Sequence, residues 1–138
     1  EAQAAMELEA FARNVLPGPG YEFGFETSGV FDAAPVIREI VTDLRSGHGP
    51  EVVARKFHQG LANAVVDIAE EVRASRDLDV VVLGGGTFQN VVLLKLITRA
   101  LTRAAFTVLS PTRLPANDGG LALGQVMVAT ANRTVAGN

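Results

Sequence analysis

The sequence contains no cysteine and no tryptophan, and it has a single tyrosine. The lack of cysteine excludes disulfides, thiolate metal ligands and a cysteine nucleophile. The scarcity of aromatic side chains argues against the stacking platforms that bind single-stranded nucleic acids. No apolar run approaches the roughly 20 residues that span a bilayer, and no signal peptide opens the chain. We therefore expect a cytoplasmic protein with no membrane partner.

Basic segments are also missing, since the net charge is −3 and the pI is about 5.3. A nucleic-acid binder usually carries a concentrated positive patch, so nucleic acid is not an expected partner. What the chain does have is apolar content: 48% of its 138 residues are hydrophobic, which argues against disorder. This length suits one domain with a modest core.

The most informative stretch runs from Asp79 to Asn90. Residues 80–83 form a short, mostly β-branched apolar run that is typical of a strand buried on both faces. Gly84, Gly85 and Gly86 follow at once, and a helical pattern begins at Val91. Glycines at a strand-to-helix turn allow a ligand to approach the backbone closely, and a nucleotide is the usual ligand. The alternative is a tight connection that needs glycine only for its geometry.

A second strand is predicted over residues 106–109, after the helix of residues 88–103. Strand, helix and strand form a βαβ unit, so we predict an α/β fold with a short, mostly parallel sheet packed by helices. Ligands of such sheets lie beyond the carboxyl ends of the strands, where the second strand leads to Asn117-Asp118-Gly119-Gly120. Asp118 is thus a candidate ligand for a cation or for ribose hydroxyls, with simple helix capping as the alternative.

The other elements are predicted from periodicity and from helix start and stop signals. We expect a hairpin over residues 21–31, with a turn at residues 27–29, and helices over residues 1–15, 33–46, 50–76 and 121–131. The last helix is apolar nearly all round, which predicts burial, and a loose tail is expected after it. The first helix has no capping residue, which suggests either a chain cut from something longer or a frayed terminus.

Two further features of the helices concern function. His58 lies at the edge of the apolar stripe of the 50–76 helix, where it could be a base, a metal ligand or a hydrogen-bonded structural histidine. Lys95, Arg99 and Arg103 recur every four residues and predict a solvated basic face.

Four motifs in order resemble those of HypF-type carbamoyltransferases. Residues 83–90, Leu-Gly-Gly-Gly-Thr-Phe-Gln-Asn, are similar to that family's Ser-Gly-Gly-Val-Phe-Gln-Asn signature, and residues 115–125 resemble its Pro-x-Asn-Asp-Gly-Gly-x-Ala-x-Gly-Gln. Phe57-His58 with Leu61-Ala62 resembles its Phe-His-x-x-Leu-Ala element. Residues 1–9 resemble its Glu-Gly-Gln-Ala-Ala and Leu-Glu. Together the motifs cover nearly the whole chain.

The resemblance implies one lobe of an actin-like ATPase fold, the C-terminal lobe of a TsaD-like carbamoyl-transfer domain, as a single domain over residues 1–138. It implies that Gly84, Gly85, Gly86, Gly119 and Asn90 hold the adenosine of ATP or carbamoyl-adenylate. Asp118 would bind a divalent metal (Zn, Fe or Mg) shared with a missing N-terminal lobe. No nucleophile or base is evident, and His58 is the weak catalytic candidate.

The activity that the resemblance implies has carbamoyl phosphate and ATP as substrates. The carbamoyl group would pass to the C-terminal cysteine of a HypE-type partner during [NiFe]-hydrogenase maturation, and the 138 residues alone are expected to be inactive. Gly84 and Thr87 depart from the family's Ser and Val. Both departures fall in the turn that the resemblance implies for the nucleotide contacts. A TsaD-like or O-carbamoyltransferase lobe and a non-catalytic scaffold that binds a partner through its basic face are the alternatives.

Overall fold

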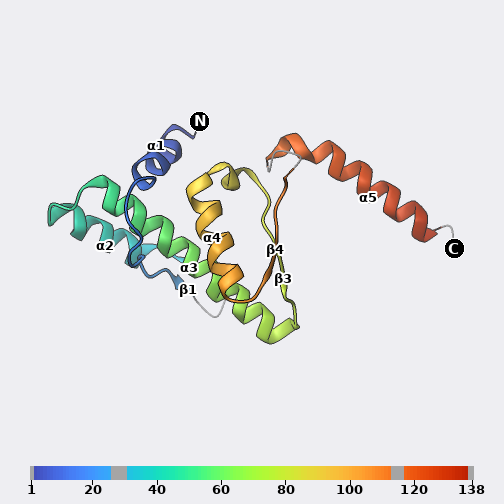
Figure 1. Ribbon diagram of the computed structural model, residues 1–138, viewed down its shortest axis with the longest axis horizontal. Helices are drawn as coiled ribbons and strands as arrows, with labels where there is room; N and C mark the ends of the chain where they lie inside the picture. The colour runs from blue at the N-terminus through green and yellow to red at the C-terminus, as the bar shows by residue number, and fades with distance from the viewer. Residues whose placement is uncertain (1, 26–30, 113–116, 137–138) are drawn as a thin grey trace.

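The structure is a computed structural model that describes residues 2–25, 31–112 and 117–136 (Figure 1). Its elements in chain order are α1 (Gln3–Ala12), β1 (Gly24–Phe25), β2 (Phe31–Asp32), α2 (Ala34–Arg45), α3 (Pro50–Arg76), β3 (Val80–Val82), the 3-10 turn η1 (Gly86–Gln89), α4 (Val91–Arg103), β4 (Thr107–Leu109), η2 (Asp118–Gly120) and α5 (Leu121–Ala136). No helix in these ranges is both long and apolar enough to cross a membrane.

The predicted βαβ unit is confirmed. Strands β3 and β4 pair in parallel, with Val80 opposite Thr107 and Val82 opposite Leu109, and α4 makes the connection between them. The ladder continues one bond further, because the Leu83 amide donates to the Leu109 carbonyl at 2.8 Å. The carboxyl ends of both strands therefore lie at the same end of the sheet (Figure 1).

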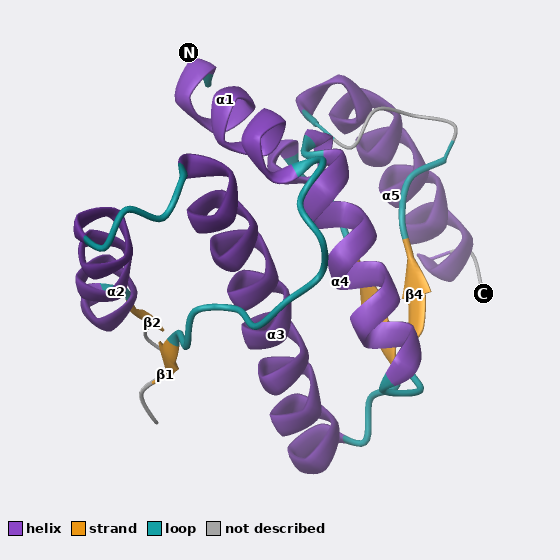
Figure 2. Ribbon diagram, turned by 60° about the vertical axis from the view of Figure 1, so that its left-hand side comes forward, coloured by secondary structure: helices purple, strands orange, loops and turns teal. Residues whose placement is uncertain are grey.

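The main core lies between the sheet and the helices, with α4 placed between α3 and β4 (Figure 2). The inward positions of α4 are Leu93, Ile97 and Leu101, spaced four residues apart so that they share one face. They pack with Leu83 and Phe106 from the strands and with Ala62 of α3. Arg73 closes one end of this core, since its guanidinium lies 4.0 Å from the centre of the Phe106 ring.

Helix α3 buries small side chains as well as large ones, and Phe57, Leu61 and Val65 of its apolar stripe are partly buried against the core. Val53 is buried as expected, but Val72 is 41% exposed, and the other buried positions are mostly small: Ala54, Gly60, Ala62 and Ala64. Small side chains let neighbouring backbones approach. At Gly60 the approach is closest, because a Cβ there would overlap the backbone of Tyr21, whose loop crosses α3 (Figure 2).

Two predictions of burial are wrong. Val80 and Val82 of β3 are 55% and 70% exposed, so this strand is covered on one face only. Helix α5 runs to Ala136, beyond the predicted end, and its apolar residues between Leu121 and Val128 are exposed. The physical reason is the same in both cases: apolar patterning shows that a face favours burial, but the described residues supply nothing to cover these faces.

The hairpin agrees with the sequence in outline, and α2 follows it directly. Strands β1 and β2 pair antiparallel, with Gly24 opposite Asp32, while the predicted turn at residues 27–29 lies outside the described residues. Helix α2 begins at Ala34, and the Asp32 carboxylate accepts a hydrogen bond from the Ala34 amide at 2.8 Å. Asp32 thus satisfies one of the free amides at the start of the helix.

Candidate functional site

The turn after β3 is open above its glycines. Gly85 has φ +103°, a conformation that side chains rarely adopt, and a Cβ at Gly84, Gly85 or Gly86 would meet nothing within 4 Å. Residues 86–89 form η1 before α4 begins, so the predicted helix start at Phe88 is a 3-10 turn. Phe88 itself packs against the core. Phe88 thus anchors this turn to the core, while the open space beside its glycines leaves room for a ligand against the backbone.

Asn90 is held in place from two sides. It is the N-cap of α4, where its Oδ1 accepts a hydrogen bond from the Leu93 amide at 2.9 Å. Its Nδ2 lies 2.9 Å from Nε2 of His58, a residue 32 positions earlier in the chain. An amide nitrogen carries two hydrogens. The described residues show a hydrogen bond for one of them, to His58, so the other N–H of Asn90 is left for a ligand.

His58 orients Asn90 as a neutral imidazole. Its side chain is only 2% exposed, and its Nδ1 lies 2.7 Å from the carbonyl oxygen of Ala54, which can only accept a hydrogen bond. Nδ1 therefore donates, and Nε2 accepts from Asn90. Both ring nitrogens of the catalytic candidate are thus engaged, and the geometry favours a role in positioning Asn90.

The second turn places Asp118 at the surface. Asn117 is the N-cap of η2, because its Oδ1 accepts from the Gly119 amide at 3.1 Å. The capping role that was the alternative for Asp118 is therefore performed by Asn117. The Asp118 side chain is exposed, and the described residues make no hydrogen bond or ion pair with its carboxylate. The parallel pairing of β3 and β4 brings this turn to the same end of the sheet as Gly84–Gly86 (Figure 1).

A metal bound here would need ligands from elsewhere. Within residues 2–25, 31–112 and 117–136, no three His, Asp or Glu side chains cluster in a way that could hold a metal ion. One exposed carboxylate is a single ligand, whereas protein sites for divalent metals usually use three or more.

A family comparison decides what the arrangement belongs to. Residues 1–125 match the family model described as "Carbamoyltransferase, Kae1-like Domain, second subdomain". The chain belongs to this family. The HypF-type resemblance and the α/β fold predicted from the sequence are thereby confirmed.

Individual HypF proteins agree with this assignment. The chain is 36% identical over 133 residues to Carbamoyltransferase HypF of Synechocystis, covering 92% of this chain and 16% of that protein. It is 39% identical over 127 residues to Carbamoyltransferase HypF of Rhizobium leguminosarum, covering 91% and 16%. The chain thus spans about a sixth of the length of these relatives.

Two solved HypF structures share the fold. The crystal structure of full-length HypF in its phosphate- and nucleotide-bound form aligns with a TM-score of 0.86 at 35% identity, covering 94% of this chain and 17% of that one. HypF of T. kodakarensis aligns with a TM-score of 0.81 at 26% identity, with the same coverage. The fold of this chain is therefore that of one segment of a HypF protein.

Sequence reasoning missed two features of this candidate site. The link between His58 and Asn90 joins two different motifs, and spacing along the chain gives no sign of it. The capping role of Asn117 was detectable, because asparagine is among the preferred N-cap residues.

Proposed function

We propose that this chain is the nucleotide-binding lobe of a carbamoyltransferase. In the complete protein, a carbamoyl group would move from carbamoyl-adenylate to the C-terminal cysteine of a HypE-type maturation protein, in the cytoplasm. Membership of the HypF carbamoyltransferase family supports the transfer chemistry. The observation that carries the nucleotide role is the pair formed by the open turn at Gly84–Gly86 and the oriented amide of Asn90.

The nucleoside would lie against the glycine turn. Open backbone at Gly84, Gly85 and Gly86 provides close contact with a flat or sugar-like group, and the remaining N–H of Asn90 provides a directed donor. Gly119 would face the same ligand from the second turn. Because His58 and the Leu93 amide hold Asn90, little side-chain entropy is lost when the ligand binds.

Asp118 would contribute one ligand to a divalent metal completed by the missing N-terminal lobe. Its exposed, unshared carboxylate suits that role. When bound, such a metal supplies Lewis-acid polarisation of the transferred carbonyl. The residues of this chain would hold the nucleoside and orient it, and carbamoyl phosphate and ATP would be the substrates of the whole protein. The 138 residues alone would be inactive, because half of the site is elsewhere.

The test is an Asp118→Ala change in the complete protein. We expect bound metal and the rate of carbamoyl transfer to fall by about tenfold or more, since removing a ligand costs more than the loss of an outer partner. Metal content is measured by elemental analysis and the rate by labelled carbamoyl transfer to the HypE-type acceptor.

Asp67→Ala is the matched control, because Asp67 is an exposed carboxylate on α3. It should leave both metal and rate unchanged. Full metal content and rate in the Asp118→Ala protein would show that Asp118 is not a ligand.

A further inference from the structure

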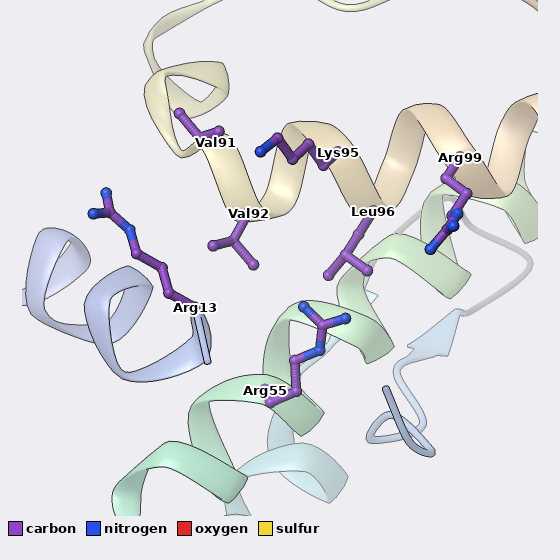
Figure 3. Close-up of a pocket in the computed structure, with 7 residues that line it drawn as sticks. All are labelled: Arg13, Arg55, Val91, Val92, Lys95, Leu96 and Arg99. Carbon is purple, nitrogen blue, oxygen red and sulfur yellow. The ribbon is translucent and has the colours of Figure 1, made fainter. Parts of the chain in front are cut away.

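A basic hollow lies between α1, α3 and α4, beside the start of α4 (Figure 3). Its volume is about 770 Å³, within the usual range for small-molecule sites. Its charged lining consists of Arg13, Arg55, Lys95 and Arg99. Gly84, Gly85, Gly86 and Asn90 do not line it, although Val91, the residue after Asn90, does. The hollow is therefore a neighbour of the nucleoside site and not the same surface.

The charge of this lining is unbalanced. The whole chain is acidic, with 15 Asp and Glu against 12 Lys and Arg, yet four cations and no carboxylate line the hollow. Arg13 is paired with Glu9 at 2.9 Å. For Arg55, Lys95 and Arg99, the described part of the chain provides no ion pair. Cations that share a concave surface repel one another, so an anion would stabilise this arrangement.

Arg55 adds a second and independent indication. Its Nε is buried and has no hydrogen-bond partner among the described residues. A buried donor without an acceptor costs free energy, and native structures almost always satisfy such groups. The Arg55 guanidinium points into the hollow between α3 and α4 (Figure 3). Nε itself is enclosed by protein, so a ligand in the hollow would meet the terminal nitrogens of this guanidinium, and Nε would gain a partner only if the side chain shifts on binding.

The positive charge extends beyond the hollow. A smaller cavity of about 150 Å³ shares Arg55 and Arg99 with it and adds Arg103. Lys95, Arg99 and Arg103 are four residues apart on α4, so their Cα atoms rise along the helix by about 6 Å per step. A row of this length fits more than one anionic group.

We propose that the basic hollow binds a phosphorylated small molecule with at least two anionic groups. Arginine guanidinium groups bind phosphate oxygens in a bidentate manner, which suits Arg55 and Arg99. Val91, Val92 and Leu96 provide an apolar wall for the rest of the ligand. The concave shape and this wall favour a small molecule over an acidic protein segment. The site is additional to the proposed nucleoside site and does not depend on carbamoyl transfer.

Pyrophosphate is the probe, titrated by calorimetry into the complete protein at about 0.15 M salt, where weak surface attraction is screened. The Arg55→Met/Arg99→Met double variant should bind it about tenfold or more weakly, since it loses two charge-assisted contacts. Lys95→Met changes one exposed side chain that the fold does not need, and should weaken binding by about threefold. Adenosine binding should be the same in all variants.

Arg38→Met is the matched control, because Arg38 is exposed on α2 and does not line the hollow. It should bind pyrophosphate like the wild type. Equal affinities in the wild type, the double variant and Lys95→Met would overturn the proposal. So would binding of a glutamate-rich peptide at Arg55 and Arg99 that pyrophosphate does not displace. Loss of adenosine binding alone would count against the proposed nucleoside site and leave the basic hollow standing.

Discussion

The turns that follow β3 and β4 lie at the same end of the sheet, but the chain supports them very differently. The first turn leads to Asn90, which His58 and the Leu93 amide hold, and then into α4 with its buried face. Within the described residues, the second turn is held by local hydrogen bonds, from the Gly119 amide to the Asn117 side chain and from the Gly120 amide to the Asn117 carbonyl, and it leads into α5. The large apolar residues of α5 from Leu121 to Val128 are between 46% and 63% exposed.

This difference teaches which half of the site the chain can organise by itself. The turn proposed to bind the nucleoside is fixed by contacts of Asn90 with other described residues. We infer that the Asp118 side becomes fixed only when another part of the complete protein covers α5, because an apolar helix of this kind is stable when its surface is buried. The comparison predicts that substitutions in the two regions have very different effects on stability.

The largest contrast is expected between Leu101→Ala and Met127→Ala. Leu101 of α4 is fully buried, so its truncation should lower the free energy of unfolding of the chain by about 3 kcal/mol or more. Met127 of α5 is 63% exposed, and its truncation should cost less than about 0.5 kcal/mol. Denaturant unfolding of the two variants measures both values. Similar losses would mean that α5 packs against the chain, and the comparison would fail.

An intermediate effect is expected at His58. His58→Ala leaves a cavity and removes the partners of Asn90 and of the Ala54 carbonyl, so we expect a loss of about 2–3 kcal/mol. Asn117→Ala removes one exposed hydrogen bond in the second turn and should cost about 0.5 kcal/mol. The free energies of unfolding of the two variants test whether support is concentrated at the first turn. A loss at Asn117 equal to that at His58 would contradict it.

The smallest effect concerns pH and the attachment of α2 to α3. Asp43 accepts hydrogen bonds from Lys56 at 2.6 Å and from Tyr21 at 2.8 Å, and these donors lower the pKa of the Asp43 carboxyl in the folded state. A lowered folded pKa stabilises the fold above the unfolded pKa of about 3.9, and this contribution is lost as the pH falls through the folded pKa.

The free energies of unfolding of the wild type and of Asp43→Asn should therefore differ less as the pH is lowered from about 5 to about 2. Unfolding free energies over that range measure it, with Asp67→Asn as the exposed control. Parallel curves for the wild type and Asp43→Asn would show that Asp43 contributes nothing through its charge.

The strand, glycine turn and helix were predictable because each depends on local sequence. The bounds of α3 agree with the prediction, since Pro50 favours a helix start and the apolar repeat continues to Val72, one turn before the helix ends at Arg76. The exposure of α5 and of the outer face of β3 was not predictable, because periodicity shows which faces are apolar but not whether the described residues supply a surface that covers them. The His58–Asn90 contact depends on how α3 packs against α4, which spacing does not reveal.

The crossing of the Pro17–Tyr21 loop over α3 limits how this part of the molecule can vary. Both segments have a glycine at the crossing, Gly20 in the loop and Gly60 in the helix. A Cβ on either residue would overlap the backbone of the other segment. The Tyr21 amide also donates to the Lys56 carbonyl at 3.1 Å, which fixes the depth of the contact. Insertions and deletions among relatives should therefore avoid this loop and collect in the exposed connection between α2 and α3.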